Sequence, residues 1–190
     1  MKKILIIDNY DSFTFNLLHL VEQFDDIEAT VKRNNAFELD ELVDYNGIIF
    51  SPGPGLPRDA GKMMDVIDKY HSSIPILGIC LGMQAIGEYF GAELVNMAMV
   101  QHGVMTKIDI LENNYLFTEI PNTIDVGRYH SWAFTCNSLP NTLIETASDG
   151  EYTMALRHKT FPIMGVQFHP ESIMTNYGYK IIGNWIKLIN

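Results

Sequence analysis

The segment around Cys80 places the strongest constraint on the fold. An apolar run over residues 75–79 leads into this cysteine, with Gly78 two residues before it and Gly82 two residues after it. Small residues at these two positions permit a sharp turn from a strand into a helix, because the backbone can approach closely without a side-chain clash. We therefore expect a buried strand before Cys80 and a helix from Leu81 to about Phe90.

The same turn bears on the reactivity of the thiol. A cysteine at the start of a helix lies near free backbone amides and the positive end of the helix dipole, and both favour the thiolate over the thiol. A free cysteine is, however, more often a buried structural residue. The spacing around Cys80 leaves both interpretations open.

Further short apolar runs indicate an α/β domain. Runs rich in β-branched residues are typical of strands buried on both faces of a parallel sheet. They occupy residues 4–7, 28–31, 47–50 and 163–168. Helical patterns lie between or after them, at residues 12–24, 38–43, 59–70 and 177–188, with Ser12 as the expected N-cap of the first. This alternation predicts a mainly parallel central sheet flanked by helices.

The pattern changes after Gly91. Five segments there read as strands without long helices between them, at residues 94–95, 105–110, 124–134, 143–147 and 152–157. We interpret them as an antiparallel β extension of the same sheet. A length of 190 residues is ordinary for one domain, so we expect a single domain over residues 1–190.

Composition excludes several classes of function. The formal net charge is −10, which argues against binding to nucleic acid or to an anionic membrane. We expect no signal peptide and no membrane-spanning segment, because no apolar run is long enough. The only cysteines, Cys80 and Cys136, are too few for a disulfide scaffold and suit a reducing cytoplasm.

Polar loops follow the predicted strands. They cover residues 8–11, 51–55 and 169–171, and Cys80 itself follows a fourth strand. Ligands bind at the carboxyl ends of the strands in open α/β sheets. If these strands are parallel neighbours, the four segments meet at one edge of the sheet.

His169 and Glu171 complete a candidate catalytic group with Cys80. They are two residues apart, so on an extended backbone they share a face, and Pro170 stiffens the segment between them. A cysteine nucleophile needs a base, and the base needs a third group that fixes its orientation. An α/β-hydrolase places its acid between the nucleophile and the histidine, which differs from the order found here.

Acyl transfer also needs donors for the developing oxyanion. The backbone N–H groups of Gly53, in a Pro-Gly-Pro-Gly turn, and of Leu81, directly after the nucleophile, are the candidates. The turn lacks the Gly-Lys-Ser/Thr of a phosphate-binding loop. The histidines show no metal-ligand spacing, so we expect no metal in this chain.

Five segments match motifs of a known family, in that family's order, across nearly the whole chain. They are residues 8–13, 51–55, 78–84, 128–132 and 165–172. With them the chain resembles the class I (triad) glutamine amidotransferases, which have a flavodoxin-like fold. The first and last segments are most similar to the glutaminase subunits of anthranilate synthase and aminodeoxychorismate synthase.

The resemblance implies roles for individual residues. Cys80 would attack the side-chain amide of L-glutamine, His169 would be the base and acid, and Glu171 would orient it. Gly53 and Leu81 would supply the oxyanion amides. The residues that would hold the amino-acid end of glutamine are Gly55, Gln84, Ser131 and Trp132. The chain departs from the family in having Trp132 in place of an aliphatic residue and Val104 in place of a basic one.

The resemblance also implies a partner. Ammonia would pass to a separate, chorismate-binding synthase subunit, which would use magnesium, whereas this chain would need no cofactor. We expect the partner to be the synthase subunit of anthranilate synthase, in tryptophan biosynthesis. The alternative is the synthase subunit of aminodeoxychorismate synthase, in folate biosynthesis, or service to both. A stand-alone cysteine hydrolase and a binding protein without activity are further alternatives, and the first and third polar loops disfavour the hydrolase.

Overall fold

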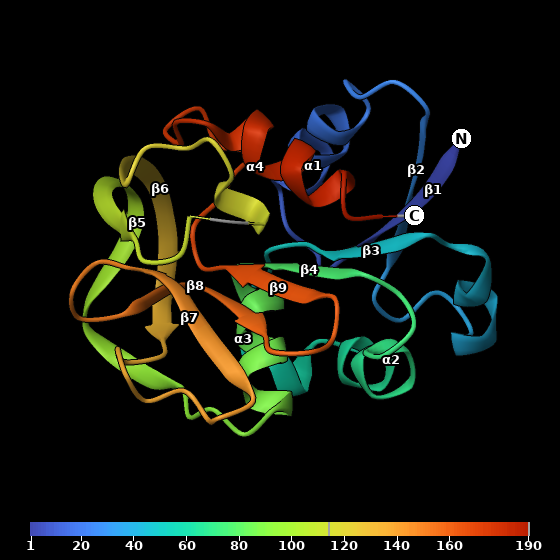
Figure 1. Cartoon of the computed structure of the whole chain (residues 1–190). Coiled ribbons are helices and arrows are strands. Elements are labelled where there is room, and N and C mark those ends of the chain that lie inside the picture. The colour runs from blue at the N-terminus through green and yellow to red at the C-terminus, as the bar shows by residue number, and fades with distance from the viewer. Residues whose placement is uncertain (114, 190) are drawn as a thin grey trace.

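The computed structural model of the chain describes residues 1–113 and 115–189. The strands of these residues form one sheet in the order β2-β1-β3-β4-β9-β8-β7-β5-β6 (Figure 1). Five neighbouring strands are parallel. They are β2 (Ile27–Arg33), β1 (Lys2–Asp8), β3 (Gly47–Phe50), β4 (Ile76–Ile79) and β9 (Ile163–Val166).

The other strands extend this sheet in antiparallel pairs. They are β8 (Thr153–His158), β7 (Leu143–Ser148), β5 (Val95–Ile110) and β6 (Thr123–Ala133). The predicted combination of a mainly parallel sheet with an antiparallel extension is confirmed. The two expected strands at residues 94–95 and 105–110 are parts of one long strand, β5, which is interrupted by irregular pairing with β6.

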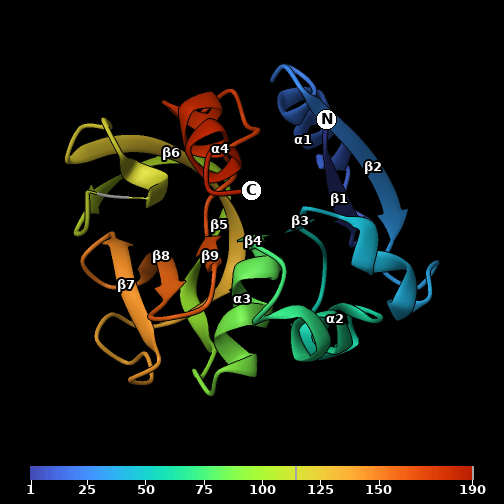
Figure 2. The same cartoon turned by 45° about the vertical axis from the view of Figure 1, so that its right-hand side comes forward.

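Helices cover both faces of the parallel strands (Figures 1 and 2). On one face lie α1 (Thr14–Val21) and α4 (Gly178–Ile186), and on the other lie α2 (Met63–Tyr70) and α3 (Leu81–Tyr89). Short 3-10 helices occur at Leu39–Asp44, Pro57–Asp59 and Tyr115–Phe117. Among the described residues, no helix is long and apolar enough to cross a membrane.

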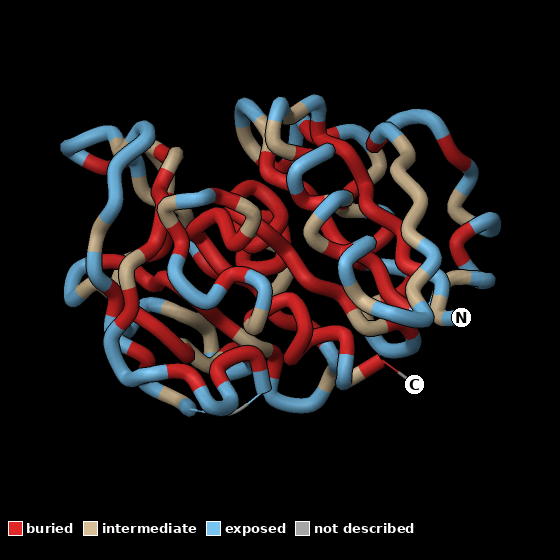
Figure 3. The backbone as a smooth tube through the Cα atoms, turned by 90° about the horizontal axis from the view of Figure 1, so that it is seen from above, coloured by how far each residue is buried: buried red, intermediate tan, exposed pale blue. Residues whose placement is uncertain are grey.

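The continuous apolar runs are explained by this double cover. Ile4 and Ile6 of β1 belong to the core beneath α1 and α4, whereas Leu5 and Ile7 belong to the core beneath α2 and α3. Side chains alternate between the faces of a strand, so a strand covered on both sides must be apolar at every position. Figure 3 shows the resulting interior as continuous buried backbone.

The start of α1 differs from the prediction. Ser12 is not its N-cap; the helix begins at Thr14 with Phe13 at the cap position and no side-chain cap hydrogen bond. The side chain of Asp11 instead accepts a hydrogen bond from the Phe13 backbone N–H at 2.8 Å. The Asp11 carboxylate, and not the Ser12 hydroxyl, therefore accepts the side-chain hydrogen bond directly before α1.

The helix expected over residues 59–70 is also interrupted. A 3-10 turn ends at Asp59, and α2 begins only at Met63. Between them Gly61 has a φ of +56°, and its backbone lies so close to Asn34 that an added Cβ would come within 2.6 Å of that side chain. The break therefore reflects a close contact between two loops, which local helix propensity does not register.

Candidate active site

The loops after β1, β3, β4 and β9 meet at one edge of the sheet. These strands are in parallel register as neighbours, so their carboxyl ends lie together. The first two loops are joined directly, because Asn9 N donates to Ser51 Oγ and Asn9 Nδ2 donates to Ser51 O, both at 2.9 Å. The polar loops therefore meet at one edge of the sheet, as the sequence predicts.

Cys80 occupies the turn between β4 and α3. Its φ of 52° and ψ of −105° are strained for a residue with a side chain. A Cβ at Gly78 would lie 2.4 Å from the Gly82 backbone, and one at Gly82 would lie 2.5 Å from the Phe50 side chain. Only glycine fits at these two positions, so the G-x-C-x-G spacing is a steric requirement of the turn.

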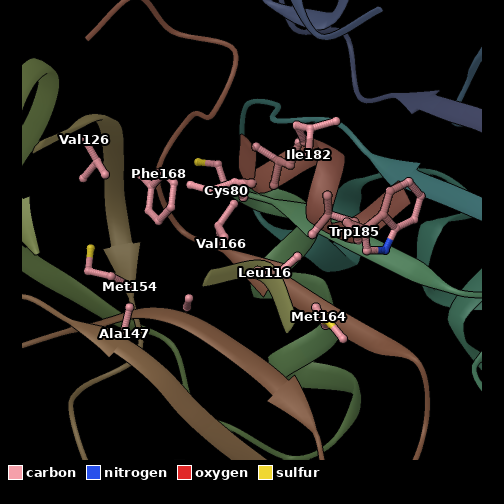
Figure 4. Packing of buried hydrophobic residues seen from close by; sticks show 14 of the residues in the cluster. Cys80, Leu116, Val126, Ala147, Met154, Met164, Val166, Phe168, Ile182 and Trp185 are labelled. Atoms are coloured by element: carbon pink, nitrogen blue, oxygen red, sulfur yellow. The ribbon is translucent and has the colours of Figure 1, made fainter. Parts of the chain in front are cut away.

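The thiol lies at the margin of the apolar core. Cys80 is 5% exposed and belongs to the same buried cluster as Val166 (Figure 4). Its backbone N–H donates to Val166 O at 2.8 Å, which ties the turn to the end of β9. Two strands therefore hold the nucleophile candidate in place.

His169 and Glu171 form a buried pair. His169 Nδ1 lies 2.7 Å from Glu171 Oε1. The imidazole also packs against aromatic rings, with centroid distances of 4.8 Å to Tyr129 and 5.7 Å to Phe13. Carboxylate and rings together leave the histidine one orientation, with Nδ1 directed at Glu171.

Hydrogen bonds and charge interactions with Cys80 and Glu171 decide the protonation of His169. Burial acts to lower its pKa, but hydrogen bonding and charge interaction with Cys80 and Glu171 outweigh burial and raise the pKa to about 10. The imidazolium is therefore the stable form at neutral pH while these two partners are charged. This is the protonation state that a thiolate–imidazolium pair requires.

A cavity of about 180 Å³ opens beside Cys80. Its walls include most of the residues expected to hold a substrate. These are Gly53, Gly55, Gln84, Ser131 and Trp132, and the candidate nucleophile Cys80 lines the same cavity. A second cavity of about 360 Å³ shares the Cys80 wall and also contacts His169. Both the thiol and the imidazole thus border space that a ligand can enter.

Leu81 and Glu171 are predicted site residues that do not line these two cavities. Leu81 is the first residue of α3, and the first backbone N–H groups of a helix have no partner within it. Gly53 approaches Leu81 so closely that an added Cβ would be 2.9 Å from its side chain. The two expected oxyanion donors therefore belong to segments in contact beside Cys80.

Gln84 and Trp132 are joined by a hydrogen bond. Gln84 Nε2 donates to Trp132 O at 2.8 Å, and His130 Nδ1 contacts the same oxygen at 3.0 Å. The Trp132 carbonyl thus accepts two hydrogen bonds from the protein. Trp132 as a residue is partly exposed and borders the cavity.

Several residues near the site were not predicted. Gln167 Nε2 donates to Cys80 Sγ at 3.5 Å, and Tyr129 borders both cavities. A signal for Gln167 exists: it interrupts an apolar run and lies two residues before His169, so the two share a face of an extended backbone. Gln101 and His102 of β5 also border the 180 Å³ cavity, but their stretch of sequence shows no strand alternation.

The same geometry bears on metal binding. No group of three or more His, Cys, Asp or Glu side chains among the described residues is arranged to hold a metal ion. Independence of this chain from cofactors stays a prediction.

Comparison with known proteins decides the family. Residues 5–188 match glutamine amidotransferase class-I. The chain belongs to this family. It is 40% identical to "Anthranilate synthase component 2" of Pseudomonas aeruginosa, over 97% of this chain and 94% of that one. It is 39% identical to "Aminodeoxychorismate/anthranilate synthase component 2" of Bacillus subtilis, over 97% of this chain and 95% of that one.

A solved structure supports the same assignment. A Thermoplasma acidophilum protein assigned to GMP synthase has a TM-score of 0.88 to this class-I amidotransferase and is 30% identical, covering 98% of this chain and 93% of that one. The resemblance read from the five motifs is thus confirmed at the level of family and fold.

Proposed function

We propose that this amidotransferase is the glutaminase subunit of anthranilate synthase, which hydrolyses L-glutamine at Cys80 and supplies ammonia to a separate chorismate-binding synthase subunit. The observation that carries the proposal is the buried His169–Glu171 pair beside the strained Cys80 turn, with Cys80 and His169 both bordering the cavity of about 360 Å³. The names of the Pseudomonas and Bacillus relatives support the choice of synthase.

In the proposed reaction, the Cys80 thiolate attacks the carbonyl carbon of the glutamine side-chain amide. His169, held by Glu171, donates its proton to the departing nitrogen, so ammonia leaves and a γ-glutamyl thioester remains. His169 then accepts a proton from water, which attacks the thioester and releases glutamate. The thiolate and the imidazolium are restored together.

Backbone donors would stabilise the tetrahedral intermediates. We assign this role to the N–H groups of Gly53 and Leu81, which belong to the two segments in contact beside Cys80. Fixed donors directed at a developing oxyanion contribute more than donors in water, about 10²–10³-fold in rate for one such group. Because they belong to the backbone, side-chain substitution does not remove them.

The amino-acid end of glutamine would lie in the cavity beside Cys80. A zwitterion needs both donors and acceptors, and Gly55, Gln84 and Ser131 border this space. The Trp132 carbonyl already accepts two hydrogen bonds, so we assign only the side chain of Trp132 to substrate contact. An indole there adds apolar wall, which suits the methylene groups of glutamine.

A second candidate is service to aminodeoxychorismate synthase, alone or together with anthranilate synthase. The name of the Bacillus relative covers both activities and therefore supports this second candidate. A stand-alone cysteine hydrolase is less well supported. In either synthase, magnesium is expected in the partner and not in this chain.

Glutamine hydrolysis measured with and without each type of synthase partner separates these candidates. We expect weak hydrolysis by the isolated chain and stimulation by the anthranilate-type partner, because docking orders the site. Stimulation by the aminodeoxychorismate-type partner alone would favour the second candidate. Full turnover without any partner would favour a stand-alone hydrolase.

A further inference from the structure

A series of hydrogen bonds between buried amides ends on the Cys80 sulfur. Gln167 Nε2 donates to Cys80 Sγ at 3.5 Å. Gln84 Nε2 donates to Gln167 Oε1 at 3.1 Å and to Trp132 O at 2.8 Å. Both glutamines are almost fully buried, where each unpaired polar atom would be costly.

Chemistry fixes the direction of this series. The backbone oxygen of Trp132 can only accept a hydrogen bond, so Gln84 must turn its NH₂ group toward it. The same NH₂ group reaches Gln167, whose nearer atom must therefore be Oε1. The remaining NH₂ group of Gln167 then faces Cys80. The orientation of both amides thus follows from one acceptor that cannot change.

A second series holds the Trp132 carbonyl from the other side. Arg128 Nε lies 3.1 Å from His130 Nε2, and because a guanidinium can only donate, His130 carries its proton on Nδ1. That proton is donated to Trp132 O at 3.0 Å. Arg128 is itself fixed by an ion pair with Asp149 at 2.5 Å.

The protonation of His130 agrees with this arrangement. Burial and the neighbouring Arg128 charge lower the pKa of His130 to about 4. The ring therefore carries a single proton at neutral pH, as an acceptor at Nε2 and a donor at Nδ1.

We propose that Gln167 stabilises the Cys80 thiolate as an N–H donor, and that Gln84 is a positioning residue that keeps this donor directed at the sulfur. A hydrogen bond to a charged group favours its charged form. Gln167 and His169 follow β9 two residues apart, and the 3.5 Å contact of Gln167 Nε2 with Cys80 Sγ brings the donor to the sulfur from this segment. The inference rests on Cys80 being the nucleophile of the proposed glutaminase.

The donor would act in both halves of the reaction. In the first half it favours the attacking thiolate over the thiol. In the second half the thiolate is the leaving group when water attacks the thioester, and a stabilised thiolate leaves faster. The sulfur of the thioester carries no charge, so the Gln167 hydrogen bond is strongest before attack and as the thiolate departs.

Alkylation of Cys80 by iodoacetamide across a range of pH tests the inference. The reaction is followed by mass spectrometry of the Cys80 peptide, which separates it from Cys136. In Gln167→Glu the acceptor for Gln84 is kept and the donor to sulfur is lost. In Gln84→Glu no N–H is left to hold the Gln167 oxygen, so the Gln167 amide can turn that oxygen toward the sulfur.

Both variants are expected to move the rising limb of the alkylation curve to higher pH by about one unit. Below the midpoint of the curve, this shift corresponds to alkylation that is about tenfold slower. Gln167→Met removes the donor without adding charge and should shift the curve in the same direction. It also serves as the test if Gln167→Glu does not fold. Unshifted curves in Gln84→Glu or in Gln167→Met would overturn the inference.

Asn184→Asp is the matched control. Asn184 is a buried amide on α4 that donates to Leu116 O and Thr118 O. The same amide-to-acid change there should lower stability and leave the alkylation curve unchanged; a shifted curve would assign the effect to general destabilisation. The alkylation assay uses no glutamine. A failure of the proposed Gln167 role can therefore be distinguished from a failure of the proposed glutaminase activity.

Discussion

His169 Nδ1 lies 2.7 Å from Glu171 Oε1, and the two side chains are 2% and 0% exposed. A carboxylate so fully removed from water needs a positive or donating partner. The second carboxylate oxygen, Oε2, has no hydrogen-bonding partner among the described residues. The imidazole is thus the partner on which the buried charge depends, and the carboxylate in turn keeps the imidazole protonated.

Glu171→Gln is predicted to reduce glutamine hydrolysis. The neutral amide cannot stabilise the imidazolium, so kcat/KM should fall by about 10²–10⁴-fold. Glu171 is one of the causes that raise the pKa of His169, so the alkaline limb of the rate profile should also move to lower pH. Steady-state kinetics across pH measure both effects.

The control for this prediction is Glu119→Gln. Glu119 pairs with Lys180 on the surface and is 75% exposed. Exposed ion pairs contribute little, so its kinetics should match those of the unmodified protein. Equal losses in the two variants would contradict the role given to Glu171.

Gly82→Ala is predicted to destabilise the fold. Alanine is the better helix former, but its Cβ would lie 2.5 Å from the Phe50 Cβ and 2.8 Å from the Phe50 carbonyl oxygen. Forcing β3 and α3 apart should cost about 1–3 kcal/mol in the free energy of unfolding. Urea denaturation measures this cost.

Asn16→Ala on the exposed face of α1 is the companion variant. It should change the free energy of unfolding by no more than about 0.5 kcal/mol. A Gly82→Ala protein as stable as Asn16→Ala would show that the turn at Cys80 has room that the structure does not contain.

Acid is predicted to destabilise the fold through His130. Its pKa is about 4 in the folded chain, against 6.5 for an unperturbed histidine. Between these values the unfolded chain binds a proton that the folded chain does not. The stabilisation is therefore complete above pH 6.5 and is lost as pH falls toward about 4, on the order of 3 kcal/mol in all.

His130→Gln isolates this contribution. Glutamine can still accept from Arg128 and donate to the Trp132 carbonyl, but it does not titrate. The free energy of unfolding of this variant should fall less steeply below pH 6.5. His169 acts in a different window, because its raised pKa makes its stabilisation decline only as pH rises from 6.5 toward about 10. Identical acid slopes in the two proteins would contradict the assignment to His130.

Much of the site could be predicted because its signals are local. The Cys80 turn needs glycine at residue 78 for a local reason, because a Cβ there would meet the Gly82 backbone, whereas Gly82 itself is required by its close approach to Phe50 on β3. His169 and Glu171 are only two residues apart, and a turn closed by the hydrogen bond from Ser172 N to His169 O at 3.1 Å brings their side chains together, in place of the extended backbone that the sequence predicts. The strand Gly47–Phe50 is found where its continuous apolar run predicts it.

Other parts depend on contacts between distant segments. Gln84 and Gln167 are 83 residues apart in sequence, and their link to the Trp132 carbonyl arises only when α3, β9 and β6 come together. The break before α2 likewise depends on the contact of Gly61 with Asn34. Periodicity and motif spacing describe one segment at a time, so neither contact is visible in the sequence.

Cys80→Ser in the complex with its chorismate-binding partner tests the central claim most directly. Product formation is measured with glutamine and, separately, with free ammonia as the nitrogen source. We predict that glutamine-dependent synthesis falls by at least about 10³-fold, whereas ammonia-dependent synthesis is unchanged. Persistence of glutamine-dependent synthesis, or loss of both, would contradict the assignment of Cys80 as the nucleophile of a glutaminase that serves another chain.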